Sequence, residues 1–498
     1  MTTMVAVDLG AESGRVALGR FDGERLSVSE VHRFPNVPVR REGVLQWDIL
    51  RLYDDVVEGL RRVARGGVAV DSIAVDSWAV DFGLLDPSGR LIQNPTHYRD
   101  DRRARAVGDV FARIPARELY ERTGIQLIPI NTIFELAAMA AKHDTALASA
   151  DRLLLIPDLF HYWLSGARVT EFTNATTTQC LDARDGVWAR DLLERLDVPT
   201  GVLSEVVPAG TVLGPLGEEA AAATGLAGAR VVAGATHDTA AAVAAVPLER
   251  PGDVYISAGT WSLVGMEVRQ PIIDDHTFAA NLTNEGGVAG TVRLLRNVTG
   301  LWLLHECRRV WAQAGGLSFE ELVALAREAA PLRALIDVDD PLFAAPGDMP
   351  ARVAEFCSAT GQPVPNDRGA VLRCILESLA LKHGQAIELL REATGASPAA
   401  VHIVGGGSRN ELLCQMTADA TGLPVVAGPT EATAIGNLLV QAIALGELAS
   451  LEQARAAVRS SFEPAVYEPG DAEDWREARR RLDRLNRVEE SPPTEVPA

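Results

Sequence analysis

The pattern of hydrophobic and polar positions switches repeatedly between a strand-like and a helix-like period along the chain. Residues 4–34 combine β-branched side chains with glycine turns, which predicts strand, tight turn and strand. Residues 47–67 place apolar side chains three and four positions apart and end in two glycines, as an amphipathic helix does. Strand-like character returns at 70–92, and helical patterns dominate residues 101–164. This alternation predicts an α/β fold.

A second half of the chain repeats the beginning. Pro247 and Pro251 precede a new strand-like run, and residues 254–268 again form a strand, glycine turn and strand pattern. Each of the two predicted hairpins holds a Gly-X-X-Ser element, "GAES" in the first and "GTWS" in the second. We therefore predict duplicated domains. The expected division is 1–246, 247–488 and a Pro- and Glu-rich disordered tail at 489–498.

Composition and charge narrow the kinds of partner. The chain has 498 residues, of which 47% are hydrophobic, and a net charge of −20, which argues against nucleic acid or an anionic membrane as a partner. No apolar run approaches the roughly 18–20 residues of a spanning helix. No signal-peptide pattern opens the chain, so we expect the cytoplasm. The five cysteines have no zinc spacing and are expected to be free thiols, although Cys357 and Cys374 could pair if geometry allows. Nothing in the sequence indicates an oligomeric state.

Lysine usage excludes two common phosphate sites. The chain has two lysines, Lys142 and Lys382, and neither follows a glycine-rich loop. A nucleotide would therefore be held without a Walker-type or protein-kinase lysine. The first hairpin turn, "DLGAESGR", offers backbone N–H groups after Asp8, and Arg15 could add a cation. Glu12 lies within this turn and is expected to point away from an anion.

Three further segments are candidates for binding. The second hairpin adds the Thr260 hydroxyl to its backbone donors. Three consecutive glycines at 404–410, "VGGGSRN", join a strand to a helix and let a ring or phosphate approach the backbone, although the spacing is not that of a dinucleotide fingerprint. The stretch "DSWAVDFG" carries Asp76, Trp78 and Asp81, which suit a sugar, but a buried strand with a core tryptophan explains the same pattern.

The stretch "GATHDTAAAV", residues 234–243, raises the question of what its carboxylate does. Asp238 lies between a strand-like run and a series of alanines. It would serve as the N-cap of the alanine-rich helix, accepting hydrogen bonds from the first turn. The same carboxylate could also act as a catalytic base. The residues of this segment leave both interpretations open.

The combination of motifs resembles the FGGY family of carbohydrate kinases. "VAVDLGAESGRV", "DSWAVDFGLLD", "YRD", "TNATTTQ", "GATHDTAAAV", "SAGTWSL", "NLTNEGG", "NVTGLWLL" and "VHIVGGGSRNELL" occur in order over about residues 4–445. The resemblance implies two actin-like, ribonuclease-H-like domains with an active-site cleft between them. It also implies ATP and Mg²⁺, and transfer of the γ-phosphoryl group to the 1-hydroxyl of the sugar L-rhamnulose.

The resemblance also assigns roles to single residues. It implies that Asp238 is the catalytic base and that Asp8 holds magnesium through water. The sugar contacts it implies are Ala79, His237, Asp238, Thr239 and Asn297. The ATP contacts it implies are Ala11, Glu12, Ser13, Gly14 and Arg15 in the first phosphate loop, Thr260 in the second, and His305 and Gly406. The chain departs from the family pattern at Ala79, where the family has glycine, and at His305, where it has glutamine.

Three alternatives stay open at this point. The nearest is another sugar kinase of the same family, acting on L-fuculose, L-ribulose or D-xylulose. An actin-like ATPase would consume ATP without a sugar. A sugar sensor without catalysis is disfavoured by the intact "HDTA" segment around Asp238. ATP consumption, measured with each of several ketoses and without any sugar, separates the three.

Overall fold

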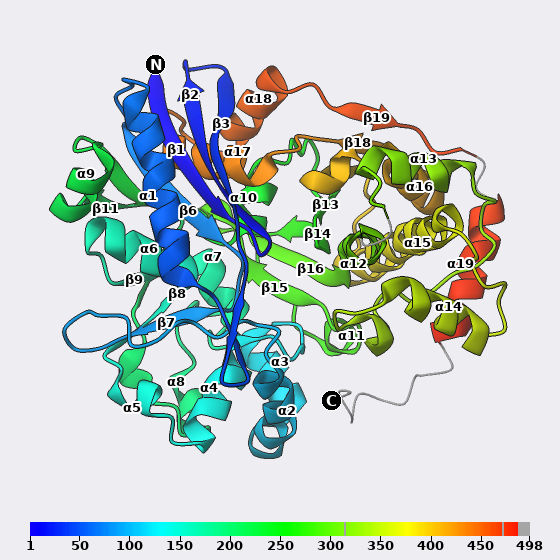
Figure 1. Cartoon of the computed structure of the whole chain (residues 1–498), viewed down its shortest axis with the longest axis horizontal. Coiled ribbons are helices and arrows are strands. Elements are labelled where there is room, and N and C mark those ends of the chain that lie inside the picture. The colour runs from blue at the N-terminus through cyan, green and yellow to red at the C-terminus, as the bar shows by residue number, and fades with distance from the viewer. Residues whose placement is uncertain (313–314, 471–472, 487–498) are drawn as a thin grey trace.

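The computed structural model describes residues 1–312, 315–470 and 473–486. Within these residues, two large mixed sheets lie side by side, with helices between and around them (Figure 1). The predicted disordered tail, 489–498, lies outside the described residues.

Each half of the chain contributes one sheet. The first has the strand order β11-β12-β6-β1-β2-β3, and the second β15-β16-β14-β13-β17-β18-β19. The strands of the first sheet are β1 (Thr2–Leu9), β2 (Ser13–Phe21), β3 (Leu26–Pro35), β6 (Ser72–Ser77), β11 (Thr211–Pro215) and β12 (Arg230–Ala233). Those of the second are β13 (Val254–Ala258), β14 (Trp261–Val268), β15 (Thr283–Gly286), β16 (Val292–Thr299), β17 (Val401–Val404), β18 (Val425–Ala427) and β19 (Ala465–Tyr467).

The two sheets share one topology. The order β3-β2-β1-β6-β12 in the first matches β16-β14-β13-β17-β18 in the second. In both, the first three strands are antiparallel, the third pairs in parallel with the fourth, and the fourth pairs in parallel with the fifth. The predicted α/β class and the two hairpin-led halves are confirmed.

Helices form the layers on both faces of each sheet. The outer face of the first sheet packs against α1 (Ile49–Arg65), α6 (Ile156–Ser165) and α9 (Glu218–Thr224). The second sheet packs on its outer side against helices that include α12 (Trp302–Ala312), α13 (Phe319–Glu328), α14 (Met349–Ala359), α15 (Arg368–Thr394) and α16 (Glu411–Thr421). Helix α19 (Glu473–Asn486) lies at the far side of this half (Figure 1).

Two helices join the halves at the centre of the molecule. Helices α10 (Asp238–Ala244) and α17 (Ala432–Ala444) occupy equivalent places in the two halves and pack against each other in a core that both sheets share. They cross very closely, since a Cβ added at Gly436 would lie 1.7 Å from the carbonyl oxygen of Ala241. The crossing therefore requires a glycine at this position.

A long insertion lies between β6 and β12 of the first sheet. It contains β7 (Phe82–Leu85), α2 (Asp101–Arg113), α3 (Ala116–Thr123), α4 (Thr132–Ala141), α5 (Thr145–Ser149), β8 (Arg152–Leu155), β9 (Val169–Glu171), α7 (Phe172–Ala175), η1 (Thr176–Thr178), α8 (Arg190–Arg195) and β10 (Glu205–Val207). Helices α2 to α6 confirm the helical character predicted for 101–164. Its own apolar cluster holds the insertion together.

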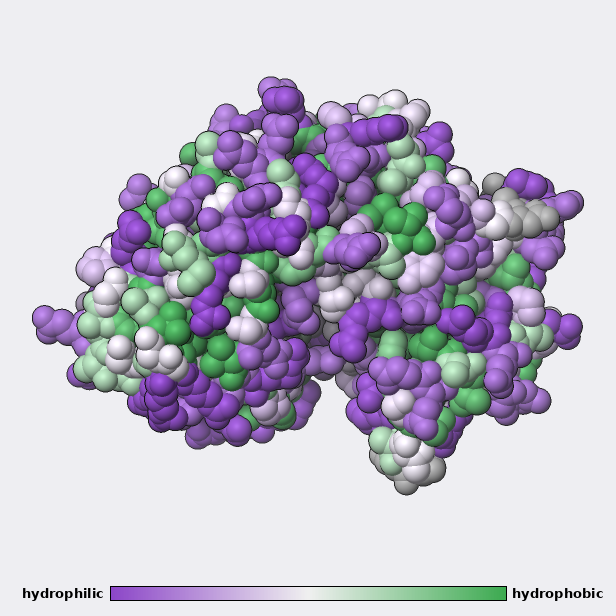
Figure 2. All heavy atoms as spheres, turned by 90° about the horizontal axis from the view of Figure 1, so that it is seen from above, coloured by the Kyte–Doolittle hydropathy of each residue, from purple (hydrophilic) through white to green (hydrophobic). Residues whose placement is uncertain are grey.

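Two global expectations can be compared with the structure. Among the described residues, no helix is long and apolar enough to cross a membrane. All five cysteines are buried free thiols, so Cys357 and Cys374 are not bonded to each other. The prediction of free thiols is confirmed. Figure 2 shows a surface of mixed polarity with a marked indentation between two lobes.

Candidate active site

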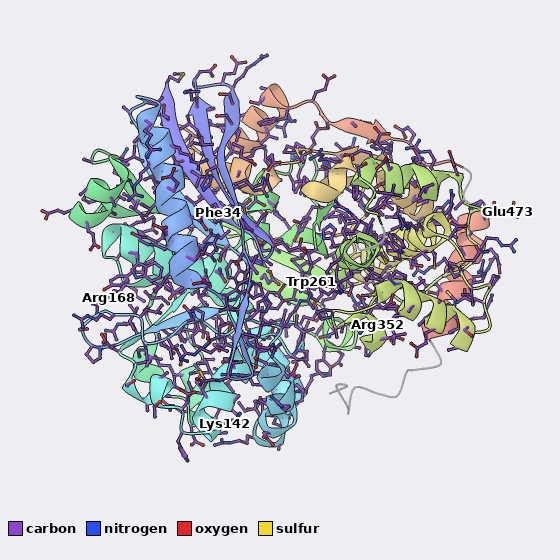
Figure 3. All side chains as sticks on the ribbon, viewed as in Figure 1. Phe34, Lys142, Arg168, Trp261, Arg352 and Glu473 are labelled. Carbon is purple, nitrogen blue, oxygen red and sulfur yellow. The ribbon has the colours of Figure 1, made fainter. Side chains whose placement is uncertain are left out.

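A cavity of about 900 Å³ lies between the two halves. Its wall is drawn from both hairpin turns, from the start of α10 and from the glycine loop after β17. Trp261, one of the lining residues, lies at the centre of the molecule (Figure 3). The predicted site residues that line the cavity are Asp8, Ala11, Glu12, Ser13, Arg15, Ala79, His237, Asp238, Thr239, Thr260, Asn297, His305 and Gly406.

Three aspartates meet where adjacent strands of the first sheet end. Asp8 near the end of β1 pairs in register with Asp76 of β6. The segment after β12 runs beside β6 through a bridge between Ser77 and His237, which places Asp238 next in line. Because the carboxyl ends of parallel strands share one edge of the sheet, three residues far apart in sequence form one acidic cluster.

Asp238 is not the helix cap that its sequence context indicates. It is the first residue of α10, and the N-cap is His237, without a side-chain cap hydrogen bond. That prediction was wrong by one position, because the bridge to Ser77 keeps His237 extended and the helix starts one residue later. The Asp238 side chain is 29% exposed to the cavity and accepts a hydrogen bond from the Thr239 hydroxyl at 3.1 Å.

The surroundings of Asp238 make it a good proton acceptor near neutral pH. Burial, and next the negative charge of Asp8, raise the pKa of the Asp238 carboxyl to about 7. A carboxylate with this pKa is ionised above neutrality and binds a proton far more readily than an exposed aspartate does.

Asp76 belongs to the same acidic cluster, although the family resemblance assigns it no role. Its side chain is fully buried, and its Oδ2 accepts a hydrogen bond from Asn437 of α17 at 2.5 Å. Burial and the charge of Asp8 hold the pKa of the Asp76 carboxyl well above its usual value. Its Oδ1 is buried without a hydrogen-bond partner.

The acidic cluster fits a magnesium ion held through water. Neighbouring carboxylates repel one another and are stabilised by a nearby cation, and carboxylate oxygen is the ligand type Mg²⁺ prefers. Among the described residues, no three acidic, histidine or cysteine side chains converge closely enough to coordinate one metal directly. Since Mg²⁺ usually keeps several of its waters, Asp8 could hold it through them.

The "DSWAVDFG" stretch contains residues that line the cavity and a buried aspartate that holds them in place. Trp78, Ala79 and Val80 line the cavity. Asp81 is buried behind them and accepts hydrogen bonds from the indole of Trp78 at 2.9 Å and from Arg103 at 2.5 Å. The buried ion pair between Asp81 and Arg103 fixes this wall of the cavity. A sugar contact from this stretch stays a prediction.

Asn297 and His237 reach the cavity with their side chains already held. The Asn297 amide donates to Gln126 Oε1 at 3.0 Å. His237 Nδ1 lies 3.0 Å from Arg293 Nη2, and its Nε2 lies 3.4 Å from Asp238 Oδ1. Burial, and next the positive charge of Arg293, hold the pKa of His237 well below its usual value.

The first hairpin turn presents backbone groups and a cation. Its turn is closed by a hydrogen bond from the Gly10 N–H to the Ser13 carbonyl at 3.0 Å. Arg15 lies 2.9 Å from Asp8 Oδ2 and also pairs with Glu431. Gly14 is absent from the cavity lining, because the ring of Phe34 packs where its Cβ would be.

Glu12 does not point away from the cavity, which corrects the expectation from its sequence. Its carboxylate accepts a hydrogen bond from the Thr260 hydroxyl of the second hairpin at 3.3 Å and lies 3.5 Å from His305 Nδ1. The nearby His305 imidazole holds the pKa of the Glu12 carboxyl below its usual value. A negative charge therefore bridges the two hairpin turns, within the space predicted for phosphates.

The loop after β17 brings backbone close to the second hairpin. Gly405 has φ +81°, and a Cβ there would lie 3.1 Å from the Ala258 carbonyl oxygen. Gly406 faces the cavity with open space around its Cα. A ligand could therefore approach the backbone of this glycine loop closely, as the sequence predicts.

The sequence did not predict the residues that hold the cavity-lining side chains in place. Arg293 contacts His237 although 56 positions separate them. Glu431 and Gln126, which hold Arg15 and Asn297, also come from distant segments. No local pattern marks these residues. "NLTNEGG" did signal the region that contains Glu285, 3.1 Å from Arg293.

The family of the chain follows from its match to known sequences. The model for the FGGY family of carbohydrate kinases, N-terminal domain, matches residues 3–245, and that for the C-terminal domain matches 254–445. The chain belongs to the FGGY family of carbohydrate kinases, as its motifs indicated.

Curated relatives make the resemblance more specific. The chain is 44% identical to the rhamnulokinase of Bacteroides thetaiotaomicron over 94% of this chain and 96% of that protein. It is 40% identical to the rhamnulokinase of Enterococcus faecalis over 94% of each. Among solved structures, it is similar to a xylulose kinase from Rhodospirillum rubrum (TM-score 0.79, 22% identity, 98% of each chain). It also resembles a glycerol kinase from Plasmodium falciparum (TM-score 0.79, 13% identity, 99% of each chain). These structures confirm the two-domain actin-like, ribonuclease-H-like fold.

Proposed function

We propose that this protein transfers the γ-phosphoryl group of ATP to the 1-hydroxyl of L-rhamnulose. The observation that carries the proposal is Asp238, whose carboxyl has a pKa raised to about 7 and faces a cavity flanked by two backbone-lined turns. The two relatives named above are rhamnulokinases over nearly their whole length, which supports the choice of sugar.

In this proposal, Asp238 accepts the proton of the sugar hydroxyl as its oxygen attacks the γ-phosphorus. The new O–P bond forms as the bond from the γ-phosphorus to the β,γ-bridging oxygen breaks, and ADP leaves with that electron pair. His237, Thr239, Asn297 and the backbone at Ala79 would hold the sugar so that this hydroxyl lies beside Asp238. Positioning of this kind supplies much of the rate in phosphoryl transfer.

The metal and nucleotide roles follow the same geometry. Mg²⁺, when bound, neutralises charge on the phosphates, and Asp8 would hold it through water. The turn containing Ala11 to Arg15, the Thr260 hydroxyl, His305 and Gly406 would contact ATP. Arg15 would exchange part of its pairing with Glu431 for phosphate oxygens.

Two wider assignments belong to the same proposal. We assign sugar binding, the first phosphate hairpin and the catalytic Asp238 to residues 1–246, and ATP binding to residues 247–488, which also supply Asn297 to the sugar. The placement of Asp238 and of the glycine loop supports this division. We assign the reaction to the cytoplasm, since five free thiols suit a reducing compartment.

A coupled assay on a panel of ketoses tests the proposal. L-Rhamnulose should give the highest kcat/KM among L-rhamnulose, L-fuculose, L-ribulose and D-xylulose. A preference of about tenfold for another ketose, roughly 1.4 kcal/mol in the transition state, would replace the substrate and leave the kinase activity standing. ATP consumption that is independent of every sugar would contradict the proposal.

A further inference from the structure

The imidazole of His237 is held by an arginine from the other half of the chain. Arg293, on β16, is fully buried, and its Nη2 lies 3.0 Å from His237 Nδ1. A guanidinium can donate hydrogen bonds but cannot accept them. His237 Nδ1 must therefore accept with its lone pair, which leaves the ring proton on Nε2.

The arginine is itself fixed, so it acts as a rigid donor. Arg293 Nε donates to the carbonyl of Gly286 at 2.9 Å, and its Nη2 lies 3.1 Å from Glu285 Oε2. Both partners belong to β15. This strand packs on the first half of the chain, where the Gly286 N–H donates to the Thr176 hydroxyl at 2.9 Å.

The charged groups around His237 come from three places. Asp238 follows it in the chain, with Oδ1 3.4 Å from Nε2, while Glu285 and Arg293 face Nδ1 from β15 and β16. The neighbouring α7 and η1 have the sequences FTNA and TTT, and Thr173 accepts the His237 N–H at 3.3 Å. Arg293 is thus the cation that faces the ring.

We propose that Arg293 is a positioning residue that keeps His237 neutral, with its proton on Nε2, so that Asp238 faces a hydrogen-bond donor and not a cation. An imidazolium 3.4 Å from Asp238 would stabilise the carboxylate and weaken it as a base. The consequence for catalysis rests on the proposed function, in which Asp238 is that base. The protonation of His237 does not depend on it.

The first test reads the ring directly in the full-length protein. Two-bond ¹H–¹⁵N correlation spectra report the tautomer of each of the nine histidines, and a His237→Gln spectrum identifies the signal of interest. We expect a neutral Nε2–H ring that takes up no proton between about pH 8 and pH 5.5. A proton on Nδ1, or a cation at neutral pH, overturns the proposal.

The second test compares two variants that differ only at Arg293. Glu285→Gln keeps the arginine and its bond to His237, and should keep the Nε2–H signal. Arg293→Met combined with Glu285→Gln removes the donor without leaving a buried carboxylate unpaired. In that variant, His237 should lose its fixed Nε2–H signal, and its pKa should rise but stay below the ordinary value of about 6.5 because burial remains. As the pKa of His237 rises, the acid limb of kcat should move to lower pH. Arg293→Lys should restore the signal of the natural protein.

A matched control separates positioning from stability. Arg455 pairs with Glu267 at 2.6 Å, and neither residue lines the cavity. Arg455→Met with Glu267→Gln should lower the melting temperature comparably and leave the His237 signal and the acid limb unchanged. An unchanged His237 signal in the Arg293→Met pair overturns the proposal. Absence of ketose phosphorylation in the natural protein would instead contradict the proposed function, and the spectra would still decide the role of Arg293.

Discussion

The two halves of the protein share a strand order but differ at the ends of their central strands. In the first half, Asp8 of β1 pairs in register with Asp76 of β6. In the second half, the equivalent hairpin places Ser257 of β13 opposite Val404 of β17. The same edge of the same topology is therefore acidic in one half and uncharged in the other.

In the proposed function, this difference divides one reaction between the two copies of a duplicated fold. Burial, and next the charge of Asp8 on the acidic edge, raise the pKa of Asp238, as suits a proton acceptor. In the proposed function, the uncharged edge would let polyphosphate approach the backbone of Thr260 and Gly406. Glu431, directly before α17, pairs with Arg15, which also pairs with Asp8 of the acidic edge.

Asp238→Asn should have the largest effect, because it removes the proton acceptor from the acidic edge. We expect kcat to fall about 10²- to 10⁴-fold, since an amide accepts no proton at neutral pH. Steady-state kinetics measure the loss, and ATP affinity, measured by calorimetry, should survive. A variant that keeps most of its turnover would move the base elsewhere.

The same variant predicts a pH-dependent gain in stability. Because the pKa of Asp238 is raised, the folded ligand-free protein binds a proton that the unfolded chain has released, and stability falls as pH rises from about 4 to 7. The melting temperature of Asp238→Asn, relative to the natural protein, should therefore be higher at about pH 8 than at about pH 5. The opposite trend would show that Asp238 is not destabilised in the fold.

Gly436→Ala should destabilise the packing of α10 against α17, which joins the two halves. The added Cβ would overlap the Ala241 carbonyl, so we expect a loss of about 1–3 kcal/mol in the free energy of unfolding. Gly108→Ala is the matched control, because Gly108 lies in α2 with open space at its Cβ position. It should gain about 0.5–1 kcal/mol from helix propensity. Equal effects of both changes in urea denaturation would contradict the close crossing.

Ser257→Asp would make the second edge acidic like the first. Ser257 lines the cavity, and a carboxylate there would repel the phosphates, so KM for MgATP should rise by about tenfold with little change in KM for the sugar. Ser257→Asn adds the same bulk without charge and should change KM for MgATP much less. If both variants behave alike, size and not charge distinguishes the two edges.

Glu12→Gln should give the smallest effect. Glu12 bridges to Thr260 within the space proposed for phosphates, and its side chain is 55% exposed. Removing its charge should lower KM for MgATP about two- to fivefold, with the larger change at low ionic strength. A rise in KM would mean that the carboxylate assists nucleotide binding.

Features of the fold and the site could be predicted from the sequence where a short stretch of residues determines them. The two hairpins and the glycine loop follow from turn chemistry in short stretches, and the site residues that the family motifs imply line the cavity except for Gly14. The position of Asp238 relative to the helix start was wrong, because the bridge between Ser77 and His237 is a tertiary contact. Glu12 was misplaced because its partners, Thr260 and His305, are about 250 or more residues away. The role of Arg293 is of the same kind.

The pH dependence of kcat/KM for the ketose tests the central claim, that the acidic edge tunes Asp238 as the base. We expect kcat/KM to rise with pH to a plateau, with an apparent pKa of about 7. In Asp8→Asn, which removes the neighbouring charge, the same limb should move to lower pH. A profile that stays flat from about pH 5 to 9, or one whose limb lies near the ordinary aspartate value of about 4, would contradict the claim.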